Sequence, residues 1–545
     1  MTNYIKKLES AIKANWDKPA LCNFKGESFT YAELAESIAK FHIFFEAAGI
    51  GKGERMAICA RNSARWGISF LAASSYGAVA VPILADFHPD SIASLTDHSE
   101  STILFTDPEI WAKLDKGVMS GLKCAISVKD HTLLYAADEA VKEAYAATAS
   151  TFTERYPMGF TRESVYYTES DLQDLAVINY TSGTTSAPKG VMLRYECLSD
   201  MLEFSQENLS CTAEDSVVSM LPLAHMYGLA CEFIYPCCSG CTIHFLGKTP
   251  SPTLLMKAMK EVRPFMVIAV PLVMEKVYKS AIKPTISKWW MKMLLWIPGI
   301  NRILYNSIGK KVKEAFGGRV RIFIMGGAAL NPEVERCFRH IRLPYTVGYG
   351  MTEASPLLTY AGWQEYVPGS CGKPVHEIRI DSEDPRHIAG EIQARGHNIC
   401  SGYYRNPEAN AMAFTEDGWL RTGDLGVMDD KGNVYIKGRS KSMILTANGQ
   451  NVYPEELEAI INSQPYIAES VVLDRASRIV GLLYLDKDAI KRDKLDEETI
   501  ADIPENARIG ANRRLPSYSQ IAKVEVMLEP FEKTPKMSIK RFLYK

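Results

Sequence analysis

The chain has 545 residues, of which 47% are hydrophobic and 23% are charged, and its formal net charge is −2 at pH 7. This length suggests more than one domain, and the composition is that of an ordinary globular protein. The small net charge supplies no strong field for nucleic acid, so we expect no nucleic-acid partner. The opening residues lack the apolar core of a signal peptide, and no uninterrupted apolar stretch is long enough to span a membrane. We therefore expect a cytoplasmic protein with peripheral membrane contact at most.

The twelve cysteines are scattered along the chain. The one cluster, Cys237-Cys-Ser-Gly-Cys241 followed by His244, offers a single CxxC pair, whereas a zinc site usually combines two such halves. With no export signal, we expect reduced thiols that pack as small buried hydrophobic residues.

The N-terminal region alternates helical and strand-like patterns. Residues 31–42 have helical spacing, with Thr30 as a possible cap. Short apolar strands are expected at residues 54–60, 78–84, 217–222, 265–270 and 321–325. This alternation is typical of an α/β fold in which helices cover parallel sheets, and ligands bind such sheets at the carboxyl ends of their strands.

A domain boundary is expected near Gly438-Arg-Ser-Lys441. Before it, residues 429–433 form a turn between two strand-like runs, 425–428 and 434–436. After it, about a hundred residues predict a small α+β unit, with strands at 469–473 and 479–485 and a charged helix from Lys487 to about Ile500. We expect a large N-terminal domain, residues 1–438, and a small mobile C-terminal domain, residues 439–545.

Residues 286–297, stopped by Pro298, predict a short helix that is apolar almost all round. Such a helix is usually buried against other elements, and we favour that interpretation. The alternative is that its tryptophans border an acyl tunnel or rest on a membrane surface. The helix is too short to span a bilayer.

Residues 180–191, which follow an apolar run, combine glycines, hydroxyls and one cation. Hydroxyl donors, exposed backbone N–H groups and a lysine are what a polyphosphate needs around it. The spacing differs from the Walker loop, because Lys189 lies beyond the hydroxyls and precedes Gly190. The phosphate-binding candidates are Thr181, Ser182, Gly183, Thr184, Thr185, Ser186 and Lys189.

This loop, Tyr180-Thr-Ser-Gly-Thr-Thr-Ser-Ala-Pro-Lys-Gly-Val191, resembles the signature of the acyl-adenylate-forming (AMP-binding) superfamily, and especially of long-chain fatty acid–CoA ligases. Further motifs follow in the family's order along most of the chain. They are Gly326-Gly-Ala-Ala-Leu330, Gly348-Tyr-Gly-Met-Thr-Glu353, Gly390-Glu-Ile-Gln-Ala-Arg-Gly396 with Gly402-Tyr-Tyr404, Arg421-Thr-Gly-Asp-Leu-Gly426, Gly438-Arg-Ser-Lys441 and Gly449-Gln-Asn-Val-Tyr-Pro454. One small departure is Ser186, where the family usually has glycine.

The resemblance implies that the cofactors are ATP and Mg²⁺, with coenzyme A as a cosubstrate. It assigns Thr181 and Glu353 to the metal and the carboxylate of Asp424 to the ribose hydroxyls. Its other nucleotide-binding candidates are Gly327, Ala328, Tyr349, Gly350, Thr352 and Arg439. The segment Leu221-Pro-Leu-Ala-His-Met-Tyr-Gly228 resembles the family's acyl-pocket segment, so His225 either lines the active site or is an ordinary core histidine.

For the second half-reaction, the resemblance implies that the C-terminal domain rotates about Lys441. Gly449 would then line the channel for the pantetheine thiol, where a glycine allows a close backbone approach.

The C-terminal segment departs from the family pattern. The family has a lysine there that bridges acyl and phosphate oxygens, and an ungapped alignment places Ser538 at this position. Serine carries no charge to stabilise the adenylation transition state. Lys536 and Lys540 flank it, and a flexible lysine in an extended segment can take over the role after a small slip.

The leading hypothesis is an ATP- and magnesium-dependent ligase that joins a medium- or long-chain fatty acid to coenzyme A. One alternative is an enzyme that delivers the acyl-adenylate to a carrier-protein pantetheine. An alternative of another class is a catalytically weak nucleotide- and acyl-binding protein, which Ser538 alone suggests.

Overall fold

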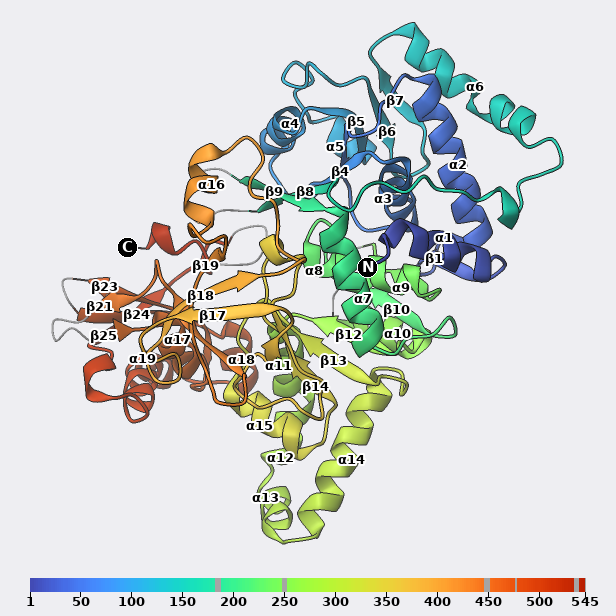
Figure 1. Ribbon diagram of the computed structural model, residues 1–545. Coiled ribbons are helices and arrows are strands. Elements are labelled where there is room, and N and C mark those ends of the chain that lie inside the picture. The colour runs from blue at the N-terminus through green and yellow to red at the C-terminus, as the bar shows by residue number, and fades with distance from the viewer. Residues whose placement is uncertain (182–187, 248–251, 446–450, 476–477, 534–538, 545) are drawn as a thin grey trace.

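The computed structural model describes residues 1–181, 188–247, 252–445, 451–475, 478–533 and 539–544. Its large N-terminal part is an α/β assembly of helix-covered sheets, and a small α+β domain follows at the C-terminal end of the chain (Figure 1). The predicted α/β class with a large and a small domain is therefore confirmed.

The main sheet has the strand order β7-β6-β5-β3-β4-β8-β9, and β8 and β9 form an antiparallel hairpin at its edge. Its central strands are parallel and fully buried, which explains why the sequence shows continuous apolar runs there. The bounds are β3 Arg55–Cys59, β4 Val79–Pro82, β5 Ser101–Thr106, β6 Cys124–Ser127, β7 Leu133–Ala136, β8 Leu175–Thr181 and β9 Lys189–Arg194.

Two further sheets complete the α/β body. One has the order β10-β11-β1-β2, and the other is the parallel sheet β12-β13-β14. The bounds are β1 Pro19–Asn23, β2 Ser28–Thr30, β10 Ser216–Ser219, β11 Thr242–Phe245, β12 Met266–Ala269, β13 Ile322–Met325 and β14 Tyr345–Val347. The strands expected at 54–60, 78–84, 217–222, 265–270 and 321–325 are thus confirmed as β3, β4, β10, β12 and β13.

Helices cover these sheets. The predicted cap at Thr30 is confirmed as a capping box with Glu33 at the start of α2. The helices of this region are α1 Tyr4–Ala14, α2 Tyr31–Ala47, α3 Ala64–Tyr76, α4 Pro89–His98, α5 Pro108–Trp111, α6 Glu139–Arg155, η1 Arg162–Ser164, α7 Tyr195–Asn208, α8 Met226–Gly228, η2 Leu229–Ile234, α9 Tyr235–Cys238, α10 Pro252–Val262, α11 Pro271–Val277, η3 Tyr278–Ile282, α12 Lys283–Ile286, α13 Trp289–Trp296, α14 Ile300–Ala315, α15 Pro332–His340 and η4 Thr352–Ala354.

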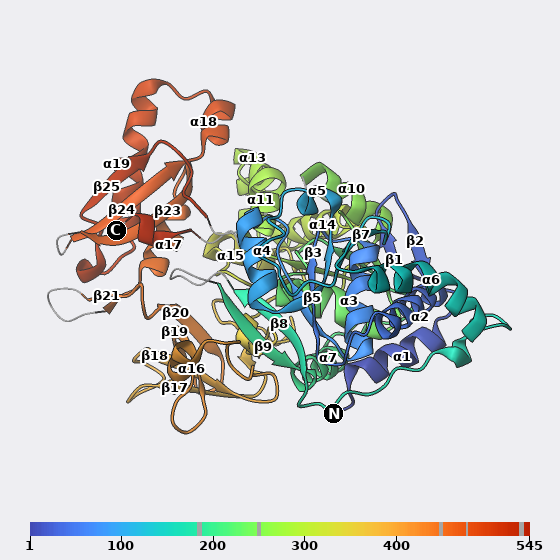
Figure 2. The same ribbon diagram turned by 90° about the horizontal axis from the view of Figure 1, so that it is seen from above.

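An antiparallel sheet, β17-β18-β19-β20, precedes the small domain in the chain and lies beside the α/β body (Figure 2). It includes the predicted strands on either side of the turn at 429–433. The bounds in this part are β15 Thr359–Tyr360, β16 Lys373–Pro374, β17 Glu377–Asp381, β18 Gly390–Arg395, α16 Pro407–Ala413, β19 Leu420–Met428 and β20 Val434–Arg439.

The small domain packs helices against the sheet β23-β24-β25. Both predicted strands are present, but the single helix expected from Lys487 to Ile500 is wrong. Lys494 adopts a left-handed conformation and separates α18 from α19, which continues past Ile500. The bounds are β21 Ile444–Leu445, β22 Asn451–Val452, α17 Pro454–Asn462, β23 Ile467–Arg475, β24 Arg478–Leu485, α18 Lys487–Asp493, α19 Glu497–Asn512, η5 Ser517–Ser519, β25 Lys523–Met527 and η6 Arg541–Leu543.

The structure corrects the interpretation that we favoured for residues 286–297. The helix there is α13, and Met291 is its one buried residue, whereas Trp289 and Trp296 are 74% and 88% exposed. The cysteines behave as expected, because most are buried and all are free thiols. Within the described residues, no helix has the length and apolar character needed to cross a membrane.

Candidate active site

The β8–β9 hairpin carries the first group of predicted site residues. Thr181 ends β8 and faces Lys189 at the start of β9, where the Thr181 hydroxyl donates to the Lys189 carbonyl over 3.4 Å. The ends of the phosphate-binding candidate loop are therefore held together by the sheet. Ser182, Gly183, Thr184, Thr185 and Ser186 lie outside the described residues, so their proposed contacts stay predictions.

Tyr403 joins Lys189 to Glu353. The Lys189 ammonium lies 4.8 Å from the centre of the Tyr403 ring, and the Tyr403 hydroxyl donates to Glu353 Oε1 over 2.9 Å. Burial and the nearby Glu353 charge raise the pKa of Tyr403, so this phenol stays neutral and keeps its proton for the carboxylate. Glu353 is only 8% exposed and belongs to η4. The structure thus brings two predicted residues from distant segments into one cluster.

Long-range pairing builds this cluster. Val191 of β9 bridges the backbone of Tyr403, and the Tyr404 N–H donates to the Gly190 carbonyl over 2.7 Å. The Cys400 N–H also donates to the carbonyl of Glu353 over 2.9 Å. Sequence reasoning quoted the Gly402-Tyr-Tyr404 motif but gave Tyr403 no role, because nothing local to it indicates a contact with Lys189 or Glu353.

A second cluster consists of Tyr349, Asp424 and Arg439. The Tyr349 hydroxyl donates to Asp424 Oδ2 over 2.7 Å, and Arg439 Nε lies 3.3 Å from Asp424 Oδ1. Burial raises the pKa of Asp424, while the Arg439 charge and the Tyr349 hydrogen bond act against that rise. Burial also holds the pKa of Tyr349 well above its usual value, so Tyr349 remains a donor. Because Tyr349 and Glu353 are four residues apart, one segment contributes to both clusters.

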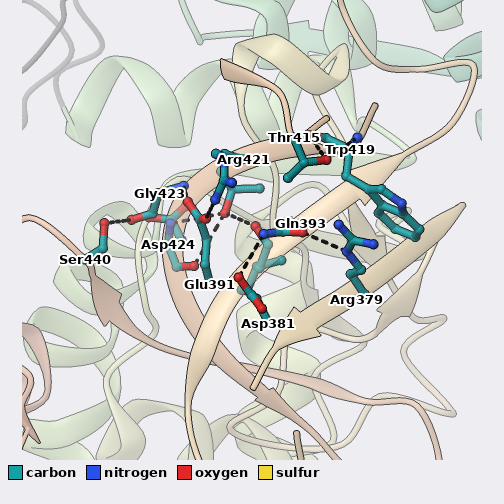
Figure 3. A network of polar contacts seen from close by, with 12 residues as sticks. Arg379, Asp381, Glu391, Gln393, Thr415, Trp419, Arg421, Gly423, Asp424 and Ser440 are labelled. Atoms are coloured by element: carbon teal, nitrogen blue, oxygen red, sulfur yellow. Dashed lines mark hydrogen bonds and ion pairs between the residues drawn. The ribbon is translucent and has the colours of Figure 1, made fainter. Parts of the chain in front are cut away.

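The backbone beside Asp424 is fixed by a polar network in the β17–β20 sheet (Figure 3). Glu391 accepts from the Gly423 N–H over 3.2 Å and from Arg421 over 3.0 Å. Thr422 donates to the Ile392 carbonyl over 2.7 Å, and the Ser440 hydroxyl donates to the Gly423 carbonyl over 3.1 Å. Glu391 was not among the predicted site residues, since a carboxylate at the end of a strand usually faces solvent.

Two of the predicted glycines have clear structural reasons. A Cβ on Gly350 would lie 1.8 Å from the Pro356 carbonyl oxygen, so any side chain there would displace the turn that carries Tyr349 and Glu353. Gly327 follows β13 with a φ of 84°, a conformation that favours glycine. Gly327 and Ala328 are exposed, and Thr352 is half-buried in η4, so all three can be reached by a ligand.

His225 occupies the N-cap position of the short helix α8, in the segment that follows β10. It is half-buried, and its N–H donates to the Pro222 carbonyl over 3.0 Å. Asn179 of β8 donates to the Ala224 carbonyl over 2.9 Å, so this segment is tied to the strand that ends at Thr181. This contact places the predicted acyl-pocket segment beside the phosphate hairpin.

Glu232 is a buried carboxyl that sequence reasoning missed. It belongs to the π-helical turn η2, and its Oε2 accepts from the N–H groups of Met220 and Leu221, both over 2.9 Å. Its Oε1 is buried without a hydrogen-bond partner among the described residues. Burial raises its pKa to about 8. A single acidic residue in an apolar run gives no periodic signal, so only the fold shows that it anchors the start of the acyl-pocket segment.

The residues that the family resemblance assigns to a magnesium ion, Thr181 and Glu353, offer a hydroxyl and a carboxylate. Both are hard oxygen ligands, and Mg²⁺ is usually held by one or two carboxylates together with waters and substrate phosphates. The described part of the chain has no cluster of three or more His, Cys, Asp or Glu side chains that could cage a metal. The donor set therefore fits an ion that arrives with a polyphosphate.

The remaining predicted residues lie at the boundary and in the small domain. Lys441 is exposed just after β20, and Lys437 forms a 3.1 Å ion pair with Glu456 of α17. Lys540 pairs with Glu532 over 3.2 Å. Gly449, Lys536 and Ser538 lie outside the described residues, so their roles stay predictions.

Comparison with known proteins finds two matching family models. The model described as "AMP-binding enzyme" matches residues 8–404, and the model described as "AMP-binding enzyme C-terminal domain" matches residues 441–544.

Two curated relatives cover most of the chain. The long-chain-fatty-acid–CoA ligase FadD15 of Mycobacterium bovis is 27% identical and covers 94% of this chain and 89% of its own. The chloroplastic long-chain-fatty-acid–acyl-carrier-protein ligase AEE15 of Arabidopsis thaliana is 26% identical and covers 94% of this chain and 80% of its own.

Among solved structures, the o-succinylbenzoate coenzyme A synthetase MenE of Bacillus subtilis, in complex with ATP and magnesium ion, has the same fold. Its TM-score is 0.74 at 22% identity, and the match covers 99% of both chains.

Proposed function

Because the chain belongs to the family of AMP-binding enzymes, we propose that it activates a medium- or long-chain fatty acid with ATP and then joins the acyl group to coenzyme A, releasing AMP and pyrophosphate. The observation that carries the proposal is a pair of clusters that the segment 349–353 links, Lys189–Tyr403–Glu353 and Tyr349–Asp424–Arg439. One cluster suits phosphates and the other suits a nucleoside.

In the first half-reaction, a carboxylate oxygen attacks the α-phosphate of ATP, and the bond to pyrophosphate breaks. Both reactants are anions, so positioning and charge determine the rate. Asp424 is an acceptor for the ribose hydroxyls, and the Tyr349 hydrogen bond holds its carboxylate in place. Lys189 supplies positive charge beside the phosphate loop. Magnesium, held by Glu353 and Thr181 when bound, would offset the charge of the phosphates.

Tyr403 is a positioning residue in this proposal. Its hydroxyl donates to one oxygen of Glu353, which leaves the other oxygen for the metal, and its ring lies against the Lys189 ammonium. A carboxylate fixed on one side loses less freedom when it binds a cation. We therefore expect Tyr403 to affect metal affinity without touching the reacting atoms.

For the acid substrate, we favour a straight-chain fatty acid. The segment 221–228 is mostly apolar and contains no aspartate, glutamate, lysine or arginine; its ionisable side chains are His225 and Tyr227, and burial raises the pKa of Tyr227, which keeps it neutral. Each buried methylene contributes about 0.8 kcal/mol, so apparent affinity should rise roughly fourfold per methylene until the pocket ends. The two curated relatives, both named as long-chain-fatty-acid ligases, support this substrate class.

In the second half-reaction, the thiol of coenzyme A attacks the acyl carbonyl, and AMP leaves. We propose that the small domain turns about Lys441 between the two steps. Lys441 is exposed, and the Ser440 hydroxyl bonds to the Gly423 carbonyl over 3.1 Å, next to Asp424. A rotation there would change the surroundings of Asp424 and Arg439 directly.

Acid-dependent ATP–pyrophosphate exchange tests the first half-reaction. We expect dodecanoate and hexadecanoate to drive exchange better than acetate, benzoate or leucine, and Asp424→Asn to lower it. Asp417→Asn is the matched control, because Asp417 is an exposed carboxylate near the same sheet that pairs with Arg379 over 2.6 Å. Faster exchange with acetate or leucine than with both fatty acids would refute the substrate class. Equal losses in the two variants would remove Asp424 from the site.

A second candidate acceptor is the pantetheine of an acyl-carrier protein, which the similarity to AEE15 supports. Adding either coenzyme A or a pantetheinylated carrier protein to enzyme with preformed acyl-adenylate separates the two. We expect thioester formation with coenzyme A. Thioester on the carrier protein alone would establish the second candidate.

A further inference from the structure

The crossover between β12 and β13 contains an exposed helical hairpin made of α13 and α14. Parallel neighbours need a crossover of roughly a dozen residues, whereas this one runs through residues 270–321. In Figure 1 the two helices project from the α/β body, with α13 at the far end. The extra length therefore forms a projection from the body.

The base of the hairpin is rigidly attached. Gly309 of α14 packs so closely that a Cβ would lie 2.0 Å from the Ile341 carbonyl oxygen. The Tyr305 ring stacks on His340 with centroids 5.0 Å apart. Because the base is fixed against α15 and its following turn, the exposure of the tip is a property of the fold.

The tip presents an apolar stripe to solvent. Trp289, Met293 and Trp296 follow helical spacing on α13 and are 74%, 62% and 88% exposed, and Ile303 of α14 is 70% exposed. Trp290, Ile297 and Ile300 add to the same exposed tip. Contiguous exposed apolar patches of this kind mark binding surfaces, and tryptophan is enriched where apolar and aqueous phases meet.

The charged residues in the sequence segment that carries the stripe are all of one sign. From residue 276 to residue 313 the chain contains nine lysines and arginines and no aspartate or glutamate. Lys288, which directly precedes α13, and Lys292 in α13 are exposed, and neither forms an ion pair with the described residues. The whole chain has a net charge of −2, so this basic segment is a local feature and not a general trend.

We propose that the α13–α14 hairpin binds the surface of an anionic lipid bilayer, with the α13 stripe in the headgroup layer and the lysines on lipid phosphates. An apolar stripe with tryptophan and a basic surround is the pattern of an interfacial helix. At eight residues, α13 is about 12 Å long and does not span the bilayer. The inference goes beyond the proposed reaction and is tested without substrate.

Flotation of the full chain with vesicles tests this inference. We expect binding to phosphatidylcholine vesicles that contain a quarter of phosphatidylglycerol and much weaker binding to phosphatidylcholine alone. The Trp289→Ser/Trp296→Ser variant should bind the anionic vesicles at least about tenfold more weakly. Trp363→Ser is the matched control, because Trp363 is an exposed tryptophan outside the hairpin, and it should bind normally.

Charge reversal at Lys288 and Lys292 gives an independent test of the proposal. Each cation near an anionic surface strengthens binding about fivefold, so Lys288→Glu/Lys292→Glu should reduce binding about a hundredfold or more. Lys373→Glu/Lys431→Glu makes the same charge change at exposed positions elsewhere and should have little effect. Wild-type binding by both hairpin variants, or equal binding of the wild type to both kinds of vesicle, would overturn the proposal.

Three other roles for the hairpin give distinct results. If the hairpin joins two copies of the chain, the wild type sediments as a dimer without lipid, the tryptophan variant sediments as a monomer, and neither floats. If the hairpin receives an acidic carrier protein, that protein competes in solution and vesicles do not bind. If the tryptophans line the acyl tunnel, the rate of ATP–pyrophosphate exchange with a soluble acid falls in the Trp289→Ser/Trp296→Ser variant. Each of these results would overturn the membrane proposal.

Discussion

Replacing the buried Glu232 with glutamine should make the protein less sensitive to alkaline pH. Burial raises the pKa of Glu232 to about 8 in the folded state, whereas the carboxyl of a glutamate in the unfolded chain has a pKa near 4.5. Between these values the folded chain holds a proton that the unfolded chain has lost. Stability therefore falls as the pH rises from the lower value to the higher one.

The magnitude follows from the two pKa values. Linkage gives a loss of roughly 2 kcal/mol in the free energy of unfolding between pH 6 and pH 8 from this group alone. Glutamine carries no charge at either pH, and its oxygen can still accept from the N–H groups of Met220 and Leu221. The Glu232→Gln variant should therefore lack this part of the pH dependence.

Urea unfolding of both proteins at pH 6 and pH 8 measures the effect. The difference between the two proteins should change by roughly 2 kcal/mol between the two pH values, because contributions from all other groups cancel. Glu9→Gln is the control. The folded pKa of Glu9 is lowered by Lys13, the Tyr167 N–H and Lys6, against the effect of burial, so it is ionised in both states throughout this range. A pH-independent difference for Glu232→Gln would refute the reasoning.

Three further substitutions test the active site. Glu353→Gln should abolish acid-dependent ATP–pyrophosphate exchange at limiting magnesium while the protein stays folded, whereas the control Glu365→Gln, at an exposed position, should catalyse exchange normally. Near-normal exchange by Glu353→Gln would remove Glu353 from the metal site. Tyr349→Phe should raise the KM for ATP at least about tenfold, because hydrogen bonds to charged groups contribute roughly 1.5–3 kcal/mol. It should also move the acidic limb of the pH profile of KM to higher pH, because loss of the Tyr349 hydrogen bond raises the pKa of Asp424 further. An unchanged KM and pH profile would contradict this role. Ser538→Lys should speed adenylation up to about a hundredfold and leave thioester formation from preformed adenylate unchanged. If Lys536 or Lys540 already fills the role, Lys536→Ala or Lys540→Ala should instead lose adenylation. Unchanged adenylation in Ser538→Lys, Lys536→Ala and Lys540→Ala would exclude this segment from the site.

The strands and the order of the motifs could be predicted because their signals are local. Buried parallel strands such as β3 and β4 read as short apolar runs, and Thr30 with Glu33 forms a capping box within four residues. Asp424 could be chosen as a candidate because its flanking residues form a motif. In each case, the residues that carry the signal are neighbours along the chain.

The contacts that organise the site are long-range, and the sequence gives no local sign of them. Tyr403 meets Lys189 and Glu353 only because its backbone pairs with Val191. Glu232 acquires its role from two N–H groups more than ten residues away. Pairing of this kind depends on strand register and turn geometry, which composition and periodicity do not determine.

The apolar residue pattern of α13 also did not predict that this helix is exposed. A helix that is apolar all round has the same sequence pattern whether it is buried or projects into solvent, so α13 was interpreted as core. The break at Lys494 was missed for a related reason, since lysine rarely adopts a positive φ and nothing near it indicates a helix end.

Product analysis tests the central proposal most directly. The purified protein is incubated with ATP, magnesium, dodecanoate and coenzyme A, and nucleotides and thioesters are identified by mass spectrometry. We expect AMP, pyrophosphate and dodecanoyl-CoA in equal amounts, and bound dodecanoyl-AMP when coenzyme A is omitted. Formation of ADP, or AMP without any dodecanoyl-CoA when coenzyme A is present, would contradict an AMP-forming fatty acid–CoA ligase.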